Sequence, residues 1–196
     1  MKLSLFVALW RNGRRARFKI SYGQLCKSSS LFSATKKDIK NMKKETLTSV
    51  FALFSTGITI VTNGTNRSKY FGCTINSFTS LSLNPPKFLF CLGNENSALK
   101  SFSNRSPLNI NILSNSQLDL SKKFSGPTED RWKNTKFDLA KNNVPFFLNS
   151  LGLIQAVVEK KILSGDHTII ICKITDYSKL KNSKSLIYYK SKYHFL

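Results

Sequence analysis

Short stretches of apolar and β-branched residues recur along the chain from residue 58 onwards, and this spacing is typical of β-strands. We expect strands over residues 58–62, 70–78, 88–92, 108–113, 154–163, 168–177 and 185–189. Many short strands with turn signals roughly every ten residues indicate a closed or nearly closed barrel. The pattern therefore predicts a mainly β fold.

A few short helices are expected beside these strands, over residues 45–55, 97–102 and 116–124. The first has apolar residues at the helical spacing i, i+3, i+4, i+7, namely Leu47, Val50, Phe51 and Phe54. The apolar face formed by Phe51 and Phe54 suits either the core or a contact between subunits. Ser114 or Ser116 is expected to cap the third helix.

Two polar features interrupt the strand pattern. Asn84-Pro85-Pro86 is expected to break strand pairing, because proline has no N–H to donate. Asn109 and Asn111 alternate with apolar residues, which predicts a strand with one polar face.

The charge of the chain is strongly positive and unevenly spread. The 196 residues include 31 Lys and Arg against 10 Asp and Glu, a formal charge of +21. Residues 1–41 hold 10 of these bases and a single acid, Asp38, so they carry +9 and the remainder carries +12. A basic surface suits either nucleic acid or phosphorylated ligands. No basic block with interleaved aromatic residues follows residue 41, so we expect no nucleic-acid partner.

Residues 1–41 are interpreted as a separate, unstructured basic extension, with the folded domain over residues 42–196. Two explanations for the extension stay open. Its Arg- and Ser-rich, acid-poor composition resembles an organelle targeting segment. Residues 10–20 also resemble the translation of a transfer-RNA gene, which indicates a mis-called start and makes Met42 the true one. We expect no membrane span, because no apolar run approaches about 18 residues, and a cytoplasmic location unless the extension is a genuine targeting segment.

Metal and nucleophile chemistry find little support in the sequence. The four cysteines lack CxxC spacing and have no histidine cluster beside them, which argues against zinc and fits a reducing compartment. The chain has two histidines, His167 and His194, and neither a GxSxG nor an HExxH motif. We infer that a bound cofactor supplies the reactivity.

Five stretches in order together resemble the flavin reductase family, the reductase partners of two-component flavin monooxygenases. They are residues 55–62 (STGITIVT), 72–86 (GCTINSFTSLSLNPP), 109–113 (NINIL), 165–169 (GDHTI) and 186–193 (LIYYKSKY). The resemblance covers about residues 45–196. It implies an FMN-binding split β-barrel that forms a homodimer, with the flavin near the subunit contact.

The resemblance also implies which residues bind the flavin, which is FMN or FAD. The expected contacts are Cys73, Thr74, Ile75, Asn76, Ser77, Thr79, Ser80, Asn94, Asn96, Phe124 and Ser125. Backbone N–H groups and short polar side chains suit the pyrimidine edge of the flavin ring. Taken alone, this polar stretch favours an ordinary polar edge strand with turn residues. The presence of Pro85-Pro86 and of the Gly-Asp-His-Thr element at 165–168 favours the flavin contact instead. Glu95 and Ala98 depart from the family pattern. Lys122 and Lys123 either compensate with positive charge at the phosphate or lie on a solvated helix face.

For the second substrate, NADH or NADPH, the resemblance implies one catalytic residue and a dinucleotide-binding ending. His167 is expected near the nicotinamide, as a group that positions it for hydride transfer. Tyr188, Tyr189, Lys190 and Lys192 match the family ending that holds the dinucleotide. In that ending two lysines replace arginines and Ser191 replaces glycine, which removes bidentate phosphate binding.

Three functions remain open from the sequence. The first is an NAD(P)H-dependent flavin reductase that supplies reduced flavin to a partner oxygenase. The second is an FMN-binding split barrel with another task, such as a pyridoxamine-phosphate oxidase-like or electron-transfer role. The third is a basic nucleic-acid-binding barrel.

Overall fold

Seven antiparallel strands form the main sheet of the protein, in the order β3-β2-β6-β9-β10-β5-β4. The computed structural model describes residues 44–66 and 69–196, so the predicted extension 1–41 and Met42 lie outside the described residues. The strands are β2 (Thr59–Asn63), β3 (Phe71–Ile75), β4 (Thr79–Leu83), β5 (Pro86–Gly93), β6 (Pro107–Ile112), β9 (Gly152–Ser164) and β10 (His167–Lys179).

The sheet curls into a barrel that is open along one seam. β3 and β4 are consecutive in the chain, yet they stand at the two ends of the strand order and are not paired. The interior is apolar and aromatic, with Val61, Phe88, Phe90, Phe102 and Ile170 all at most 1% exposed. The predicted mainly β fold with a few short helices is confirmed.

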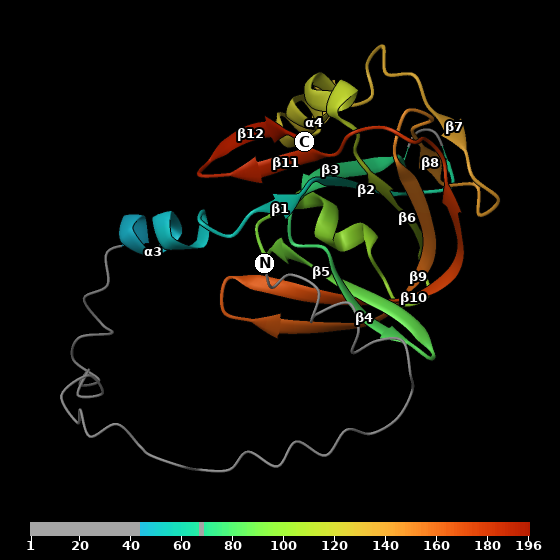
Figure 1. Cartoon of the computed structure of the whole chain (residues 1–196). Helices are drawn as coiled ribbons and strands as arrows, with labels where there is room; N and C mark the ends of the chain where they lie inside the picture. Colours follow the sequence, from blue (N-terminus) through green and yellow to red (C-terminus); the bar gives the residue numbers. More distant parts are fainter. Residues whose placement is uncertain (1–43, 67–68) are drawn as a thin grey trace, which may run out of the picture. The chain divides into compact units, whose positions relative to one another are not determined.

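A smaller three-stranded sheet and several short elements cover the outside of the barrel (Figure 1). Its strands are β1 (Thr56–Gly57), β11 (Leu186–Tyr189) and β12 (Lys192–Phe195). The helices are α3 (Lys44–Phe51), η2 (Ser97–Ser101), η3 (Asn115–Gln117), α4 (Leu118–Ser125) and η4 (Thr128–Asp130), and a two-stranded ribbon consists of β7 (Asp138–Leu139) and β8 (Pro145–Phe146). In Figure 1, α4 lies beside the β11–β12 hairpin.

A second apolar cluster lies on the outer face of β2. Side chains alternate along a strand, so Val61 points into the barrel while Ile60 points outward. Ile60 packs there with Leu113, Phe124 and Leu186. Both faces of β2 are therefore buried, and α4 is fixed on the barrel wall by the ring of Phe124.

Strand pairing around the prolines differs from the prediction. Residues 79–83 form β4, which pairs with β5 across the prolines, and Pro86 begins β5 opposite Leu83. Pro86 is the first residue of β5, and β5 pairs with β10 only from Lys87 onwards, so no bond to β10 needs its missing N–H. The prolines thus shape the turn of a hairpin instead of ending the pairing.

The polar face predicted for β6 is present, and it is buried. Asn109 and Asn111 have no exposed surface. The Asn109 amide donates to the Val144 carbonyl at 3.0 Å, and the Asn111 amide oxygen accepts from the Phe147 N–H at 2.9 Å. Because buried polar groups need partners, these amides fasten the loop segment 144–147 to the barrel.

No helix in the described part of the chain is both long enough and apolar enough to cross a membrane.

Candidate active site

A cavity of about 320 Å³ lies where the barrel, α4 and the C-terminal hairpin meet. One wall is the end of β3 and its continuation, with Thr74, Ile75 and Asn76, and Ser125 closes it from α4. Ile58, Tyr188, Ser191 and Tyr193 form the rest. The cavity thus brings together five of the predicted site residues, from three separate stretches of sequence: Thr74, Ile75, Asn76, Ser125 and Tyr188.

Thr74 and Asn76 offer different hydrogen-bonding capacities to a ligand. The Thr74 hydroxyl donates to the Ser121 carbonyl at 2.7 Å, so it can only accept a hydrogen bond from a ligand. Asn76 is exposed, and its amide has no hydrogen bond with the described residues. Asn76 can therefore donate and accept at once, as the edge of a heterocyclic ring requires.

The hydroxyl of Ser77 is used inside the protein. It donates to the Cys91 carbonyl and accepts from the Cys91 N–H, both at 3.0 Å. This pair of bonds fastens the segment after β3 to β5. The hydroxyl has no proton left to donate, so a ligand contact of Ser77 would use its backbone or the remaining lone pair of the hydroxyl, and that contact remains a prediction.

Asn94 and His167 belong to a separate cluster at the tip of the β9–β10 hairpin. The Asn94 amide oxygen accepts from the Thr168 hydroxyl at 2.8 Å, and its amide nitrogen donates to the Gly165 carbonyl at 3.1 Å. The His167 ring is paired through Nδ1 with Asp166 at 2.8 Å, and the His167 side chain is 54% exposed. The side chain of Asn94 therefore holds the turn that carries His167.

The remaining predicted flavin contacts are placed as follows. Asn96 caps η2 by accepting from the Ala98 N–H at 2.9 Å. Phe124 and Cys73 are buried, which leaves only their backbone groups for a ligand, and burial raises the pKa of the Cys73 thiol to about 11 despite the nearby charge of Arg131. Thr79 and Ser80 lie exposed on β4, away from the lining of the cavity.

The turn between β11 and β12 carries the predicted dinucleotide contacts in an unusual backbone conformation. Lys190 and Ser191 both have positive φ, 48° and 57°. This region favours glycine, so the serine at 191 is held there at a conformational cost. Lys190 stays beside the ring of Tyr189, with its Nζ 5.4 Å from the ring centre, and the Lys190 N–H donates to the Ala52 carbonyl at 2.8 Å.

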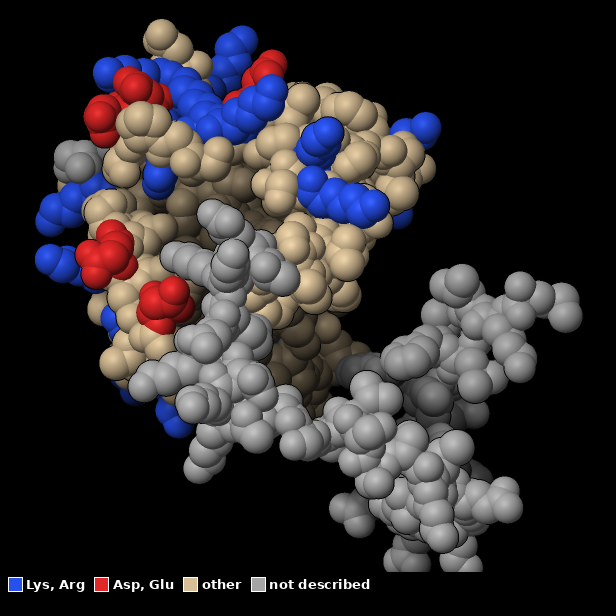
Figure 2. Space-filling model, turned by 90° about the vertical axis from the view of Figure 1, so that its left-hand side faces the viewer, with Lys and Arg blue, Asp and Glu red and all other residues tan. Residues whose placement is uncertain are grey.

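Positive charge gathers beside the cavity on the α4 side. Figure 2 shows Lys and Arg side chains, with acidic ones among them, at the top of the molecule, where Figure 1 places α4. The bases there include Lys122 and Lys123 in the last turn of α4. Among the described residues, no group of three or more metal-ligating side chains is found.

The comparison with known families decides the relationship. The model of the family described as "Flavin reductase like domain" matches residues 51–196.

The chain belongs to this flavin reductase-like family. The similar proteins include "Probable flavin reductase" of Rhizobium meliloti (strain 1021), 36% identical over 131 residues, which are 67% of this chain and 42% of that protein. Another is the reductase component of the flavin-dependent trigonelline monooxygenase of Acinetobacter baylyi, 29% identical over 75% of this chain and 47% of that protein. The chain thus spans about half the length of these curated relatives.

Solved structures agree with the family assignment. Flavin reductase HpaC, crystallised with NADP⁺, is 28% identical and superposes with a TM-score of 0.71 over 79% of this chain and 98% of its own. Component B of nitrilotriacetate monooxygenase from Mycobacterium thermoresistibile is 27% identical, with a TM-score of 0.72 over 78% of this chain and 86% of its own. The split-barrel fold expected from the sequence is confirmed.

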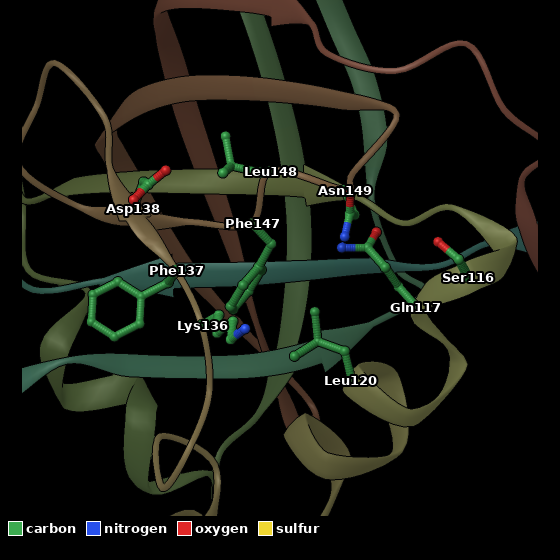
Figure 3. A pocket seen from close by; sticks show the side chains of 9 residues that line it. All are labelled: Ser116, Gln117, Leu120, Lys136, Phe137, Asp138, Phe147, Leu148 and Asn149. Atoms are coloured by element: carbon green, nitrogen blue, oxygen red, sulfur yellow. The ribbon is translucent and has the colours of Figure 1, made fainter.

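Within this flavin reductase-like domain, a larger hollow of about 500 Å³ contains none of the predicted site residues (Figure 3). Its polar lining has local structural uses. Gln117, buried in this wall, accepts from the Ser114 N–H at 3.0 Å and so caps η3. Size alone therefore does not identify the site, and the smaller cavity is the one lined by five of the predicted residues.

Three residues at the candidate site were not predicted as ligand contacts: Ser191 and Tyr193 line the cavity, and Ser121 lies behind it in contact with Thr74 and Tyr193. Tyr193 is the last residue of the stretch 186–193 that resembles the family, and this position was the signal available in the sequence. Ser121 is a small polar residue within a helix, and no feature of the sequence around it indicates its contacts with Thr74 and Tyr193.

Proposed function

We propose that this domain is an NAD(P)H-dependent flavin reductase, which passes a hydride from a nicotinamide to bound FMN or FAD. The observation that carries the proposal is the cavity that joins Thr74 and Asn76 to the rings of Tyr188 and Tyr193. Family membership over residues 51–196 supports it, as do the relatives named as flavin reductases.

The chemistry of the cavity suits a flavin ring. Its volume of about 320 Å³ lies at the lower end of ligand pockets, so it suits a ring system with the phosphate-bearing tail outside. Asn76 can donate to ring oxygens and accept from the ring N–H, while Thr74 accepts. Lys122 at the end of α4 would meet a phosphate outside the cavity.

In this function the chain orients and the bound flavin supplies the redox chemistry. His167 is proposed as the catalytic residue that positions the nicotinamide. Its Nδ1 is held by Asp166 at 2.8 Å, which leaves Nε2 for the substrate. Tyr188, Tyr189, Lys190 and Lys192 are proposed to hold the dinucleotide, with charge supplied by the two lysines.

The partners are part of the same proposal. We infer a homodimer, because α3 and the residues after it leave a large apolar surface uncovered: Val50 is 55%, Phe51 66% and Phe54 78% exposed. This placement rules out the core as the destination of Phe51 and Phe54 in the subunit. We also propose a flavin-dependent oxygenase as the acceptor of reduced flavin, since relatives are named as reductase components of monooxygenases.

A direct assay tests the function. Purified protein is incubated in air with each pairing of FMN or FAD with NADH or NADPH, and nicotinamide oxidation is followed by its absorbance. We expect flavin-dependent oxidation with at least one pairing. No oxidation with any pairing at saturating concentrations would overturn the proposal. Phe51→Asp should give a monomer in light scattering if α3 forms the subunit contact.

A further inference from the structure

Ser121 connects the two walls of the candidate site. It lies within α4 and has no exposed surface. Its carbonyl accepts from the Thr74 hydroxyl at 2.7 Å, and its own hydroxyl is 3.1 Å from the hydroxyl of Tyr193. One buried residue therefore holds a side chain of the barrel wall and a side chain of the C-terminal hairpin.

The two walls belong to different sheets, so this connection is structurally important. Thr74 lies on β3 of the seven-stranded sheet and Tyr193 on β12 of the three-stranded one. The ring of Tyr193 meets the ring of Tyr188 edge-on, with centroids 5.4 Å apart, and both rings line the cavity. Without the Ser121 bond, the Tyr193 ring would keep its packing but lose the polar contact that fixes its outer end.

We propose that Ser121 and Tyr193 act as a pair that sets the spacing between the flavin and the nicotinamide. Tyr193 forms the ring wall on the nicotinamide side, and Ser121 is a positioning residue that acts through it. This inference rests on the proposed reductase function. Hydride transfer needs reacting atoms about 3–3.5 Å apart, so a wall that shifts slightly reduces the rate more than it reduces binding.

The prediction separates binding from rate. The flavin edge faces Thr74 and Asn76, which do not depend on the Tyr193 hydroxyl. Tyr193→Phe removes that hydroxyl and keeps the ring, and Ser121→Ala removes the other partner. Each should lower kcat by about 3- to 10-fold, the effect of one hydrogen bond, while the Kd of the flavin changes less than twofold.

The double variant decides whether the two residues act as a unit. Residues that act through one shared bond are non-additive, so Ser121→Ala/Tyr193→Phe should be no slower than the slower single variant. Ser150→Ala and Tyr177→Phe are the matched controls: Ser150 is buried outside the cavity and Tyr177 is 75% exposed. Both controls should retain the wild-type kcat.

The experiment measures kcat, KM for the nicotinamide and flavin Kd for all these proteins, with melting temperatures to confirm folding. Two results with an active wild type would overturn this inference but not the proposed function. In the first, Tyr193→Phe has the wild-type kcat. In the second, the losses of kcat in the two single variants multiply in the double variant. A loss of flavin affinity at unchanged kcat would likewise overturn this inference alone. If Ser121→Ala does not fold, Tyr193→Phe decides alone. An inactive wild type would overturn the proposed function and this inference with it.

Discussion

Asn94 and Thr168 are joined side chain to side chain, the threonine hydroxyl donating to the asparagine amide oxygen at 2.8 Å. This bond crosses from the end of β5 to the start of β10, next to His167. The structure therefore explains the asparagine at position 94 by its hold on the turn, whereas the sequence resemblance suggested a direct flavin contact.

Asn94→Ala should separate these two roles. It removes the bonds to Thr168 and Gly165, so His167 loses its fixed position, and we expect kcat for nicotinamide oxidation to fall about tenfold with flavin Kd nearly unchanged. Thr168→Val should have a smaller effect in the same direction, and Thr168→Ser should behave as wild type. If Asn94→Ala instead weakens flavin binding tenfold at constant kcat, the direct contact is correct. Steady-state kinetics measures kcat, and flavin titration measures the Kd of the flavin.

Ser191→Gly should stabilise the protein. A φ of 57° destabilises a residue with a side chain by about 1–2 kcal/mol, and glycine avoids this strain. Glycine also has more conformational freedom in the unfolded chain, which offsets part of the gain. We expect a gain of about 0.5–1 kcal/mol in the free energy of unfolding, measured by urea denaturation. Ser178→Gly, at an exposed position within β10, is the control and should lose a similar amount. Equal losses in both variants would show that the turn is not strained.

Gly72→Ala should destabilise the wall that carries Thr74. A Cβ at this position would lie 2.6 Å from the Phe124 ring and 3.2 Å from the Trp132 ring. Overpacking of this kind costs about 1–3 kcal/mol. Gly57→Ala, where a Cβ would meet nothing within 4 Å, should be close to neutral. The double variant Gly72→Ala/Phe124→Leu should recover part of the lost stability, and no recovery would contradict a clash with the Phe124 ring.

Stability should fall in alkaline solution because of two buried thiols. Burial raises the pKa of Cys73 to about 11 and that of Cys172 to about 12, from 9.0. Between pH 9 and these values only the unfolded chain releases the protons, so each thiol lowers the unfolding free energy by up to about 1.4 kcal/mol per pH unit. Below pH 9 the contribution is fully present. Replacing Cys172 by alanine should make the decline less steep, and an unchanged slope would contradict this account.

The sequence predicted the helices and strands whose apolar residues recur at a regular spacing. It was less informative about polar side chains whose hydrogen-bond partners lie far away in the sequence. The strands around Ile60, Phe90 and Ile170 were correctly expected, because both burial and β-propensity act locally on them. The polar face of β6 was also expected, but the sequence did not show that this face is buried. Its actual partners, the backbone groups of residues 144–147, lie more than thirty residues away.

The candidate site shows the same division. Thr74, Asn76 and Tyr188 were named from separate motifs of the sequence, and the structure brings them to one cavity. The engagement of Ser77 with Cys91 could not be predicted, because it depends on the spacing between β3 and β5 after folding. Nor could the bridging role of Ser121, whose two partners, Thr74 and Tyr193, lie 47 and 72 residues away.

The long β9–β10 hairpin has a consequence for solubility. β9 is bonded on its outer side only as far as Val158, so the stretch after it is an unpaired strand edge within the described residues. Such edges recruit strands from other molecules. Here the exposed edge begins with Glu159, Lys160 and Lys161, whose charges oppose that pairing. Replacing these residues with apolar ones would turn the hairpin into a seed for aggregation while leaving the fold itself intact.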